Sequence, residues 1–410
     1  MILTIMYNKS LRLLVLTVLG TICTVGCKKT TPKIVIDTSA RPPVTLETDT
    51  TLKIDTAVSL IDTVFQNRIN GYAAYRAPVL LNTQQGTLIA FCEGRKIGGG
   101  DSGEVDVVFR RSVDNGKTWG EQRVAFHDGK NACDNPSVVQ DQTTGTIWLV
   151  MSQNLNKDFE DSIIATKNTH GRTVWVASSN DDGVTWTIPT EITQAVKDPS
   201  WHWYATGPGT GIQLAHGPHK GRLIIGCDHS FFTDADKFMY SSHIIYSDDH
   251  GVSWHASGNT IANTNECQPV EVSSNNKQYN GEILLNSRYY GGGSFRAQSN
   301  SYDGGITWTA SLPVLSLTDP ICEGSIYRYS WKTDSTVSCL LFSNLNSLGY
   351  RVNLTLKMSL DEGRTWQLLK VLHKGPAGYS SLSVINKKTV ACLYESGTVD
   401  PYETIVFVRL

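Results

Sequence analysis

The chain has 410 residues, of which 18% are charged and 40% are hydrophobic, and its formal net charge is −2 at neutral pH. This balance gives no reason to expect nucleic acid or an anionic membrane surface as a partner, because both attract basic proteins. Short apolar runs are separated by glycine, asparagine, aspartate and serine, and long amphipathic helical stretches are absent, which indicates an all-β protein.

The first 27 residues are typical of a bacterial export signal. Lys9 and Arg12 give a positive start, and Leu11 to Cys23 form an apolar core that is too short to span a bilayer as a helix. Residues 24–27, Thr-Val-Gly-Cys, resemble a lipobox, in which the cysteine is lipidated, although threonine stands where leucine is usual. We therefore expect export and a lipid on Cys27 that anchors the protein in the cell envelope, in the periplasm or at the outer-membrane surface. Ordinary signal cleavage nearby is the alternative.

Residues 28–60 are rich in threonine, lysine, proline and aspartate and poor in aromatic residues, which predicts a flexible tether before one large β domain at 61–410. Seven cysteines remain after the export signal, and an odd number of scattered cysteines does not make a disulfide framework. We expect most of them to be small buried hydrophobic residues. They are Cys92, Cys133, Cys227, Cys267, Cys322, Cys339 and Cys392.

One eight-residue pattern, Ser-x-Asp-x-Gly-x-Thr/Ser-Trp, occurs five times and is called the Asp box below. The copies begin at Ser112, Ser179, Ser247, Ser301 and Ser359, so that their starts lie 67, 68, 54 and 58 residues apart. Aspartate and glycine favour a turn, the hydroxyl group can bond the backbone locally, and the tryptophan can pack on apolar neighbours. Because alternating apolar and polar residues surround the copies, each box is predicted to lie at the tip of a β-hairpin.

The box intervals predict a repeat of about 55–65 residues built from short strands, which is typical of a propeller blade. Shared among six blades, residues 61–410 give about 58 residues each. We therefore predict a six-bladed β-propeller with Asp-box hairpins. The blade without a box would close the ring from both ends of the domain.

Three arginines lie outside the boxes in unusual local sequence: Arg76 in Tyr-Arg-Ala-Pro, Arg288 in Leu-Asn-Ser-Arg and Arg351 in Gly-Tyr-Arg-Val-Asn. They are far apart along the chain, but a propeller brings the inner ends of all blades to one axis. Three planar guanidinium groups that converge there would form a site for a carboxylate.

Six motifs in the domain resemble those of bacterial exo-α-sialidases (neuraminidases) of the six-bladed, Asp-box or BNR-repeat family, and those of animal sialidases. Residues 75–78 are similar to the family's Phe/Tyr-Arg-Ile-Pro motif, with Ala77 in place of isoleucine. The other motifs follow in family order: Leu88–Arg95 with Asp101 after it, Thr206–Leu214, Glu266–Glu271, Cys322–Ile326 and Pro376–Leu382. The resemblance covers the chain from about Val64 to its last residue.

The resemblance implies a retaining exo-α-sialidase that removes terminal α-linked sialic acids from glycoproteins, glycolipids and oligosaccharides, without a metal or an organic cofactor. It implies Tyr379 as the nucleophile, Glu266 as the base that takes its proton, and Asp101 as the acid. A neutral tyrosine suits this substrate, because the carboxylate on its anomeric carbon would repel a carboxylate nucleophile. An ordinary tyrosine has a pKa of about 10, so it needs a base beside it.

The resemblance also implies that Arg76, Arg288 and Arg351 hold the carboxylate of the substrate. Glu395 would fix Arg76 by a charge-assisted pair, and Arg95 would line the pocket near the C4 substituent of the sugar. These assignments have rivals in the sequence. The rivals are Glu104 and Asp106 for the acid, Glu403 for the partner of Arg76, and an ion pair with Glu93 for the role of Arg95.

Two further groups of residues leave their roles open. Trp201, Trp203 and Tyr204 are candidates for the walls of an aglycone subsite and equally for buried core. His216 and His219 have a loose metal-ligand spacing in a loop that contains glycine and proline, but no third ligand, so a surface turn is expected there and a metal site is not.

A non-catalytic propeller that binds glycans or proteins is the alternative function, because this scaffold also serves binding roles. A binding-only relative would be expected to lack the tyrosine–glutamate pair, the acid or one arginine, and each has a candidate in this sequence. Within the enzyme class, a trans-sialidase or an intramolecular trans-sialidase would use the same core residues. In each case the expected partners are sialylated glycans and glycoconjugates.

Overall fold

The computed structural model describes residues 52, 54–165, 170–260, 263–273, 279–332, 337–386 and 388–410. The expected export signal, the lipid site at Cys27 and most of the expected tether lie outside these residues. The described part holds twenty-five strands and two short helices, α1 (Glu160–Ile164) and α2 (Thr193–Val196). The prediction of an all-β protein is therefore confirmed, and neither of these helices is long and apolar enough to cross a membrane.

The strands form six blades of four main strands each. Blade 1 comprises β2 (Ala74–Asn82), β3 (Leu88–Arg95), β4 (Val105–Ser112) and β5 (Arg123–Phe126). Blade 2 comprises β6 (Ala132–Gln140), β7 (Ile147–Asn154), β8 (Thr173–Ser179) and β9 (Thr190–Glu191). Blade 3 comprises β10 (Tyr204–Thr206), β13 (Leu223–Phe232), β14 (Phe238–Ser247) and β15 (His255–Ala256); β12 (Ile212–Gln213) also pairs with β13, and β11 (Gly209–Thr210) pairs with β6.

The second half of the domain repeats this arrangement. Blade 4 comprises β16 (Thr264–Val272), β17 (Glu282–Tyr289), β18 (Phe295–Ser301) and β19 (Leu312–Thr318). Blade 5 comprises β20 (Ser325–Ser330), β21 (Cys339–Leu345), β22 (Val352–Ser359) and the first half of β23 (Gln367–Asn386). Blade 6 comprises the second half of β23, β24 (Thr389–Ser396), β25 (Thr404–Arg409) and β1 (Leu60–Gln66). The long strand β23 thus pairs with β22 up to Pro376 and with β24 from Ala377 onward.

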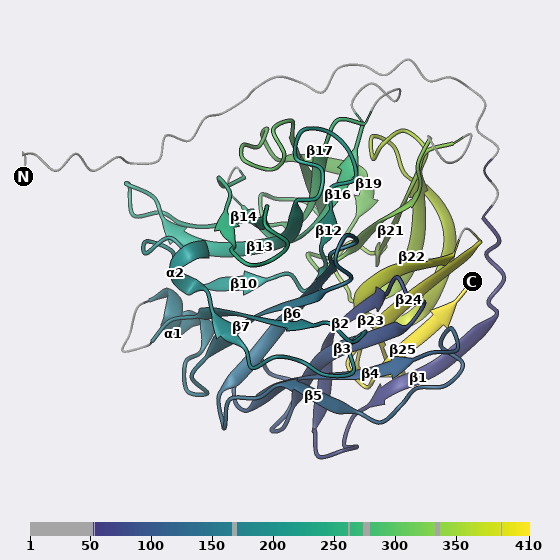
Figure 1. Cartoon of the computed structure of the whole chain (residues 1–410), viewed down its shortest axis with the longest axis horizontal. Helices are drawn as coiled ribbons and strands as arrows, with labels where there is room; N and C mark the ends of the chain where they lie inside the picture. The colour runs from purple at the N-terminus through teal and green to yellow at the C-terminus, as the bar shows by residue number, and fades with distance from the viewer. Residues whose placement is uncertain are drawn as a thin grey trace, which may run out of the picture. The chain divides into compact units, whose positions relative to one another are not determined.

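Inner strands of neighbouring blades contact one another and close a ring: β2 lies beside β6 and β23 (Figure 1), β6 beside β10, β13 beside β16, and β20 beside β16 and β23. The ring is completed in blade 6, where β1 from the start of the domain pairs antiparallel with β25 at its end. This blade carries no Asp box. The predictions of a six-bladed propeller and of a box-free closing blade are both confirmed.

Each Asp box connects the third strand of a blade to the fourth. In the first box, Ser112 Oγ donates to Asp114 Oδ1 (2.8 Å) and accepts the N–H of Gly116 (2.9 Å). Asp114 also accepts the N–H and the hydroxyl group of Thr118, at 2.9 and 2.7 Å. The same four bonds recur in the other four boxes. The boxes therefore hold the tips of the hairpins, as predicted.

Two other features of the domain were anticipated in part. All seven cysteines within the described residues are buried and free, as expected of small hydrophobic side chains. At the start of the described residues, Leu52 and Ile54 pack against the hydrophobic cluster that contains Leu382, so the end of the expected tether lies on the propeller. The N–H of Ser59 then donates to the carbonyl oxygen of Arg409 at 2.8 Å.

Two neutral histidines are buried inside blade 3. His229 on β13 and His243 on β14 are both 0% exposed, and their Nδ1 atoms lie 3.0 Å apart, so one donates to the other. His243 Nε2 lies 3.1 Å from the hydroxyl group of Tyr204, and Trp201 stacks on His229. Burial lowers the pKa of His243 to about 3 and lowers that of His229 well below its ordinary value. The folded state therefore keeps both rings uncharged.

These histidines are expected to make the domain less stable in acid. Below the ordinary pKa of about 6.5 these histidines become protonated in the unfolded chain but stay neutral in the folded chain. The free energy of unfolding therefore falls as pH decreases towards 3. For His243 the loss between pH 6.5 and 5 is about 2 kcal/mol. Urea unfolding at several pH values should show this loss, and His243→Gln, which cannot be protonated, should reduce it. The same substitution at the exposed His255 serves as the control, and an unchanged pH dependence in His243→Gln would contradict the prediction.

Candidate active site

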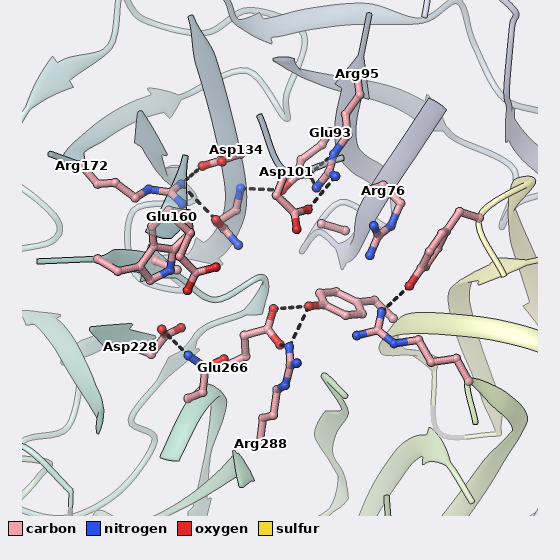
Figure 2. A pocket seen from close by; sticks show the side chains of 18 of the residues that line it. Arg76, Glu93, Arg95, Asp101, Asp134, Glu160, Arg172, Asp228, Glu266 and Arg288 are labelled. Carbon is pink, nitrogen blue, oxygen red and sulfur yellow. Dashed lines mark hydrogen bonds and ion pairs between the residues drawn. The ribbon is translucent and has the colours of Figure 1, made fainter. Parts of the chain in front are cut away.

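The described residues form a polar cavity of about 230 Å³ to which all six blades contribute residues (Figure 2). The structure brings seven of the eight predicted site residues to its wall and places the eighth, Glu395, against Arg76. The seven lining residues are Arg76, Arg95, Asp101, Glu266, Arg288, Arg351 and Tyr379. Residues from β2 to β23 thus converge, as the ring of inner strands requires.

A tyrosine, a glutamate and an arginine form the centre of the cavity. The hydroxyl group of Tyr379 on β23 donates to Glu266 Oε1 on β16 in a short hydrogen bond. Arg288, on β17, donates through Nη1 to Glu266 Oε2 (2.9 Å) and to the Tyr379 hydroxyl oxygen (3.3 Å). Burial and the negative charge of Glu266 hold the pKa of Tyr379 well above 10, although Arg288 opposes them. The phenol is therefore neutral, and its proton already faces a base.

The other two predicted arginines also lie close to Tyr379, with guanidinium carbons 5.5 Å (Arg76) and 5.4 Å (Arg351) from the centre of its ring. Arg76 Nε donates to Glu395 Oε1 at 2.7 Å, and Glu395 is completely buried. Arg351 Nη1 donates to the hydroxyl oxygen of Tyr402 at 2.6 Å, and the Arg76 guanidinium carbon lies 3.7 Å from the centre of the same tyrosine ring. Tyr402 thus orients both arginines. The three cations come from blades 1, 4 and 5, and planar guanidinium groups are suited to binding a carboxylate.

Asp101 lies on the loop between β3 and β4 with a side chain that is 71% exposed. Its Oδ1 accepts a hydrogen bond from Arg95 Nη1 at 2.7 Å, and Arg95 Nε and Nη2 are held by Glu93 at 2.9 and 2.5 Å. The surrounding protein displaces part of the water near Asp101, which raises its pKa, but the charges of Arg95 and Arg76 outweigh this effect and leave the pKa below its ordinary value. Arg95 therefore lines the cavity and also pairs with Glu93.

The rival carboxylates lie elsewhere. Asp106 is buried and does not line the cavity, and its Oδ2 accepts the hydroxyl group of Tyr72 at 2.7 Å. Glu104 pairs with Lys96. Glu403 accepts backbone N–H groups of residues 398–400 and does not contact Arg76. Of the carboxylates weighed, only Asp101 lines the cavity as a possible acid, and only Glu395 reaches Arg76.

The aromatic and histidine candidates separate in the structure. Trp203 lines the cavity, while Trp201 stacks in the interior of blade 3 with its ring centre 6.1 Å from that of the fully buried Tyr204. His216 Nδ1 lies 2.9 Å from Glu271 Oε1, away from the cavity. Within the described residues no group of histidine, cysteine and carboxylate side chains could hold a metal ion.

Part of the cavity wall was not predicted from the sequence. Arg172 is fully buried over the ring of Trp203 (4.0 Å) and donates to Asp134 and to Asn135. Glu160 on α1 accepts the hydroxyl group of Tyr240 at 2.5 Å. Figure 2 shows Arg172, Asp134 and Glu160 on the side of the cavity away from Arg76. None of them lies in one of the motifs above, and a single charged residue before a strand or in a loop carries no signal of its own.

A buried carboxyl group completes this wall. Asp228 on β13 is 0% exposed, and its Oδ2 accepts the side-chain N–H of Asn265 at 2.7 Å. Burial, with the negative charges of Glu266 and Glu160, holds the pKa of Asp228 well above its ordinary value. Burial likewise raises the pKa of Glu160. On the side of the cavity that faces the three arginines, Asp228 and Glu160 therefore carry less negative charge than two ordinary carboxyl groups would.

Comparison with known proteins agrees with this geometry. Residues 78–392 match the model of the BNR repeat-like domain family. The chain is 34% identical to a sialidase of Micromonospora viridifaciens over 341 residues, which is 81% of this chain and 51% of the relative. It is 34% identical to a sialidase of Bacteroides fragilis over 379 residues, 84% of this chain and 66% of the relative. The chain therefore spans about half the length of the first relative and somewhat less than two thirds of the second.

A solved structure leads to the same family. The fold is similar to that of the Hadza microbial sialidase, with a TM-score of 0.73 and 32% sequence identity, covering 85% of this chain and 68% of that one. Fold and sequence thus agree over most of the described domain. The chain belongs to the BNR-repeat sialidase family.

Proposed function

We propose that the protein is a retaining exo-α-sialidase that uses Tyr379 as its nucleophile. The observation that carries this proposal is the hydrogen bond from the Tyr379 hydroxyl group to Glu266 inside a ring of three arginines. A neutral phenol beside a base suits an anomeric carbon that bears a carboxylate, since an anionic nucleophile would be repelled. The proposed substrates are terminal α-linked sialic acids of glycoproteins, glycolipids and oligosaccharides.

In the first step Arg76, Arg288 and Arg351 would bind the substrate carboxylate and orient the anomeric carbon towards Tyr379. The Tyr379 oxygen forms a bond to that carbon while its proton passes to Glu266. The bond to the leaving oxygen breaks, and Asp101, which must be protonated in the reacting complex, supplies the proton that this oxygen needs. The product of the step is a sugar bound covalently to Tyr379.

In the second step the acid and the base reverse their roles. Asp101, now ionised, takes a proton from water as the water oxygen attacks the anomeric carbon. The bond to Tyr379 breaks, and Glu266 returns its proton to the phenol oxygen. Two inversions at one carbon leave the released sugar in the α configuration.

The test of this function is the time-resolved NMR spectrum of the full chain acting on an aryl α-sialoside. Early release of α-sialic acid is expected, followed by slower conversion to the β form in solution. Early release of the β form would contradict the retaining mechanism, and an anhydro sugar would identify an intramolecular trans-sialidase. Binding of the sialoside without turnover would favour the non-catalytic propeller.

Replacing Asp101 with asparagine is expected to have an effect that depends on the leaving group. An alkyl leaving group needs the proton of the acid, so kcat should fall by about 10²-fold or more. A nitrophenyl leaving group departs without that proton, and kcat should fall by less than about tenfold. Steady-state kinetics with both sialosides test this, with Asp106→Asn as the matched control outside the cavity. Equal losses for both leaving groups would show that Asp101 is not the acid.

Export and lipid attachment at Cys27 are also proposed, from the sequence of residues 1–27. Labelling of cells with a radioactive fatty acid should mark the full-length protein, and Cys27→Ala should abolish the label. An unlabelled wild-type protein would favour ordinary signal cleavage.

A further inference from the structure

The nucleophile proposed above stands at an irregular point of its strand. The pairing of β23 with β24 shifts register between Ala377 and Ser380, so that Gly378 and Tyr379 lie in a β-bulge. Bulges are common beside active sites because they redirect a side chain. Gly378 is required here, since a Cβ atom at this position would lie 1.9 Å from Glu395 Oε2.

Two carboxyl groups hold the backbone at this bulge. The N–H of Tyr379 donates to Glu395 Oε2 at 2.9 Å, and the N–H of Ser380 donates to Glu323 Oε2, also at 2.9 Å. Glu395 has a second partner in Arg76 and so belongs to the arginine site. Glu323 is 4% exposed, does not line the cavity, and has no part in the two proposed chemical steps.

Glu323 is carried by a tightly fixed turn between β19 and β20. Asp319 Oδ1 accepts the N–H of Cys322 at 2.7 Å, and the buried Arg296 donates to the carbonyl oxygen of Cys322. Ile321 has a φ of +61°, a left-handed conformation that a β-branched residue rarely adopts. Such strain persists only where surrounding contacts impose it, and it gathers at functional sites.

We infer that Glu323 is a positioning residue for Tyr379: by accepting the N–H of Ser380 it fixes the bulge that keeps the Tyr379 hydroxyl group against Glu266. This inference rests on the proposed function. Burying a polar carboxyl group is costly unless its oxygen atoms are hydrogen-bonded, and an apolar residue would serve if the turn only had to fill space. A second backbone N–H of β23 is also held by a side chain from the segment that carries Glu323: the N–H of Leu382 donates to Ser325 Oγ at 3.0 Å.

The effect on catalysis separates positioning from general stability. Glu323→Ala removes the acceptor, and a nucleophile displaced by even about 1 Å can lose about 10²-fold in rate. We expect kcat for an aryl α-sialoside to fall by about 10- to 100-fold with KM changed by less than about threefold. Glu323→Gln keeps a carbonyl oxygen at the same place and should restore kcat to within about threefold of wild type.

The matched control is Glu271→Ala. Glu271 is also buried (3% exposed) and also accepts a backbone N–H, that of Ala215 at 2.6 Å, but lies away from the cavity. Both alanine variants should lower the melting temperature, and only Glu323→Ala should lower kcat. Equal kcat in the two alanine variants would overturn the inference, as would Glu323→Gln being as slow as Glu323→Ala.

A second measurement does not depend on turnover. In protein labelled with 3-fluorotyrosine, the ¹⁹F resonance that is missing from Tyr379→Phe reports the surroundings of Tyr379. It should shift or broaden in Glu323→Ala and remain in place in Glu323→Gln and Glu271→Ala. An unchanged resonance in Glu323→Ala would overturn the inference even if wild-type protein proved inactive, whereas wild-type inactivity would count against the proposed function alone.

Discussion

Replacing Tyr379 with phenylalanine is expected to lower kcat for an aryl α-sialoside by about 10³-fold or more while KM changes by less than about threefold. The substitution removes one oxygen atom, the one that would form the covalent bond to the sugar. The three arginines and the ring that packs among them remain, so binding of the substrate carboxylate should persist. Steady-state kinetics at one pH, with a direct binding measurement for the unreactive product, provide the test.

The matched control for this substitution is Tyr394→Phe. Tyr394 is buried on β24, 3% exposed, and does not line the cavity. The control should lose stability without losing kcat. A Tyr379→Phe variant that keeps more than about a tenth of the wild-type kcat would remove Tyr379 from the mechanism.

Replacing Arg351 with lysine is expected to lower kcat/KM for a sialoside by about 10²-fold. A lysine keeps the charge but loses the planar pair of donors that matches a carboxylate. Arg351 is the best arginine for this test, because within the described residues its side chain bonds Tyr402 and pairs with no carboxylate. Arg351→Lys therefore leaves no buried carboxylate without its partner. Arg76→Lys, by contrast, would leave the buried Glu395 without its partner.

The carboxylate itself can be tested with an ester analogue of the same sialoside. Wild-type protein should prefer the free acid strongly. Arg351→Lys should reduce this preference, because the substitution should lower kcat/KM for the free acid and not for the ester. Arg110→Lys is the control, since Arg110 lies outside the cavity. Equal losses of the acid and the ester would mean that Arg351 supports the fold and not the carboxylate.

The fold was largely predictable because the Asp boxes are local. Four hydrogen bonds within eight residues fix each hairpin tip, so the pattern can be recognised in the sequence even where the rest of the blade differs from copy to copy. The merging of blades 5 and 6 through the single strand β23 was not predictable. Residues 375–378, Gly-Pro-Ala-Gly, favour a turn and not one continuous strand. Only the positions of β22 and β24 in space decide which strand each half of β23 joins.

The residues of the site were likewise predictable only in part. Residues within recognisable motifs, such as Arg76, Glu266 and Tyr379, were predicted and meet in one cavity. Tyr402 and Arg172 were missed, because each acts through a contact with a residue far away in the sequence. Such contacts depend on how loops from different blades meet at the axis, which a single sequence does not reveal.

The central claim is that the sugar becomes attached to Tyr379. 2,3-Difluorosialic acid tests it directly, because fluorine beside the anomeric carbon slows the release of a covalently bound sugar. The full chain should be mixed with this reagent, quenched, digested and analysed by mass spectrometry. The account predicts one added sugar on the peptide that contains Tyr379, and none in Tyr379→Phe. A sugar on Glu266 or Asp101, or turnover of sialosides with no covalent species under these conditions, would contradict it.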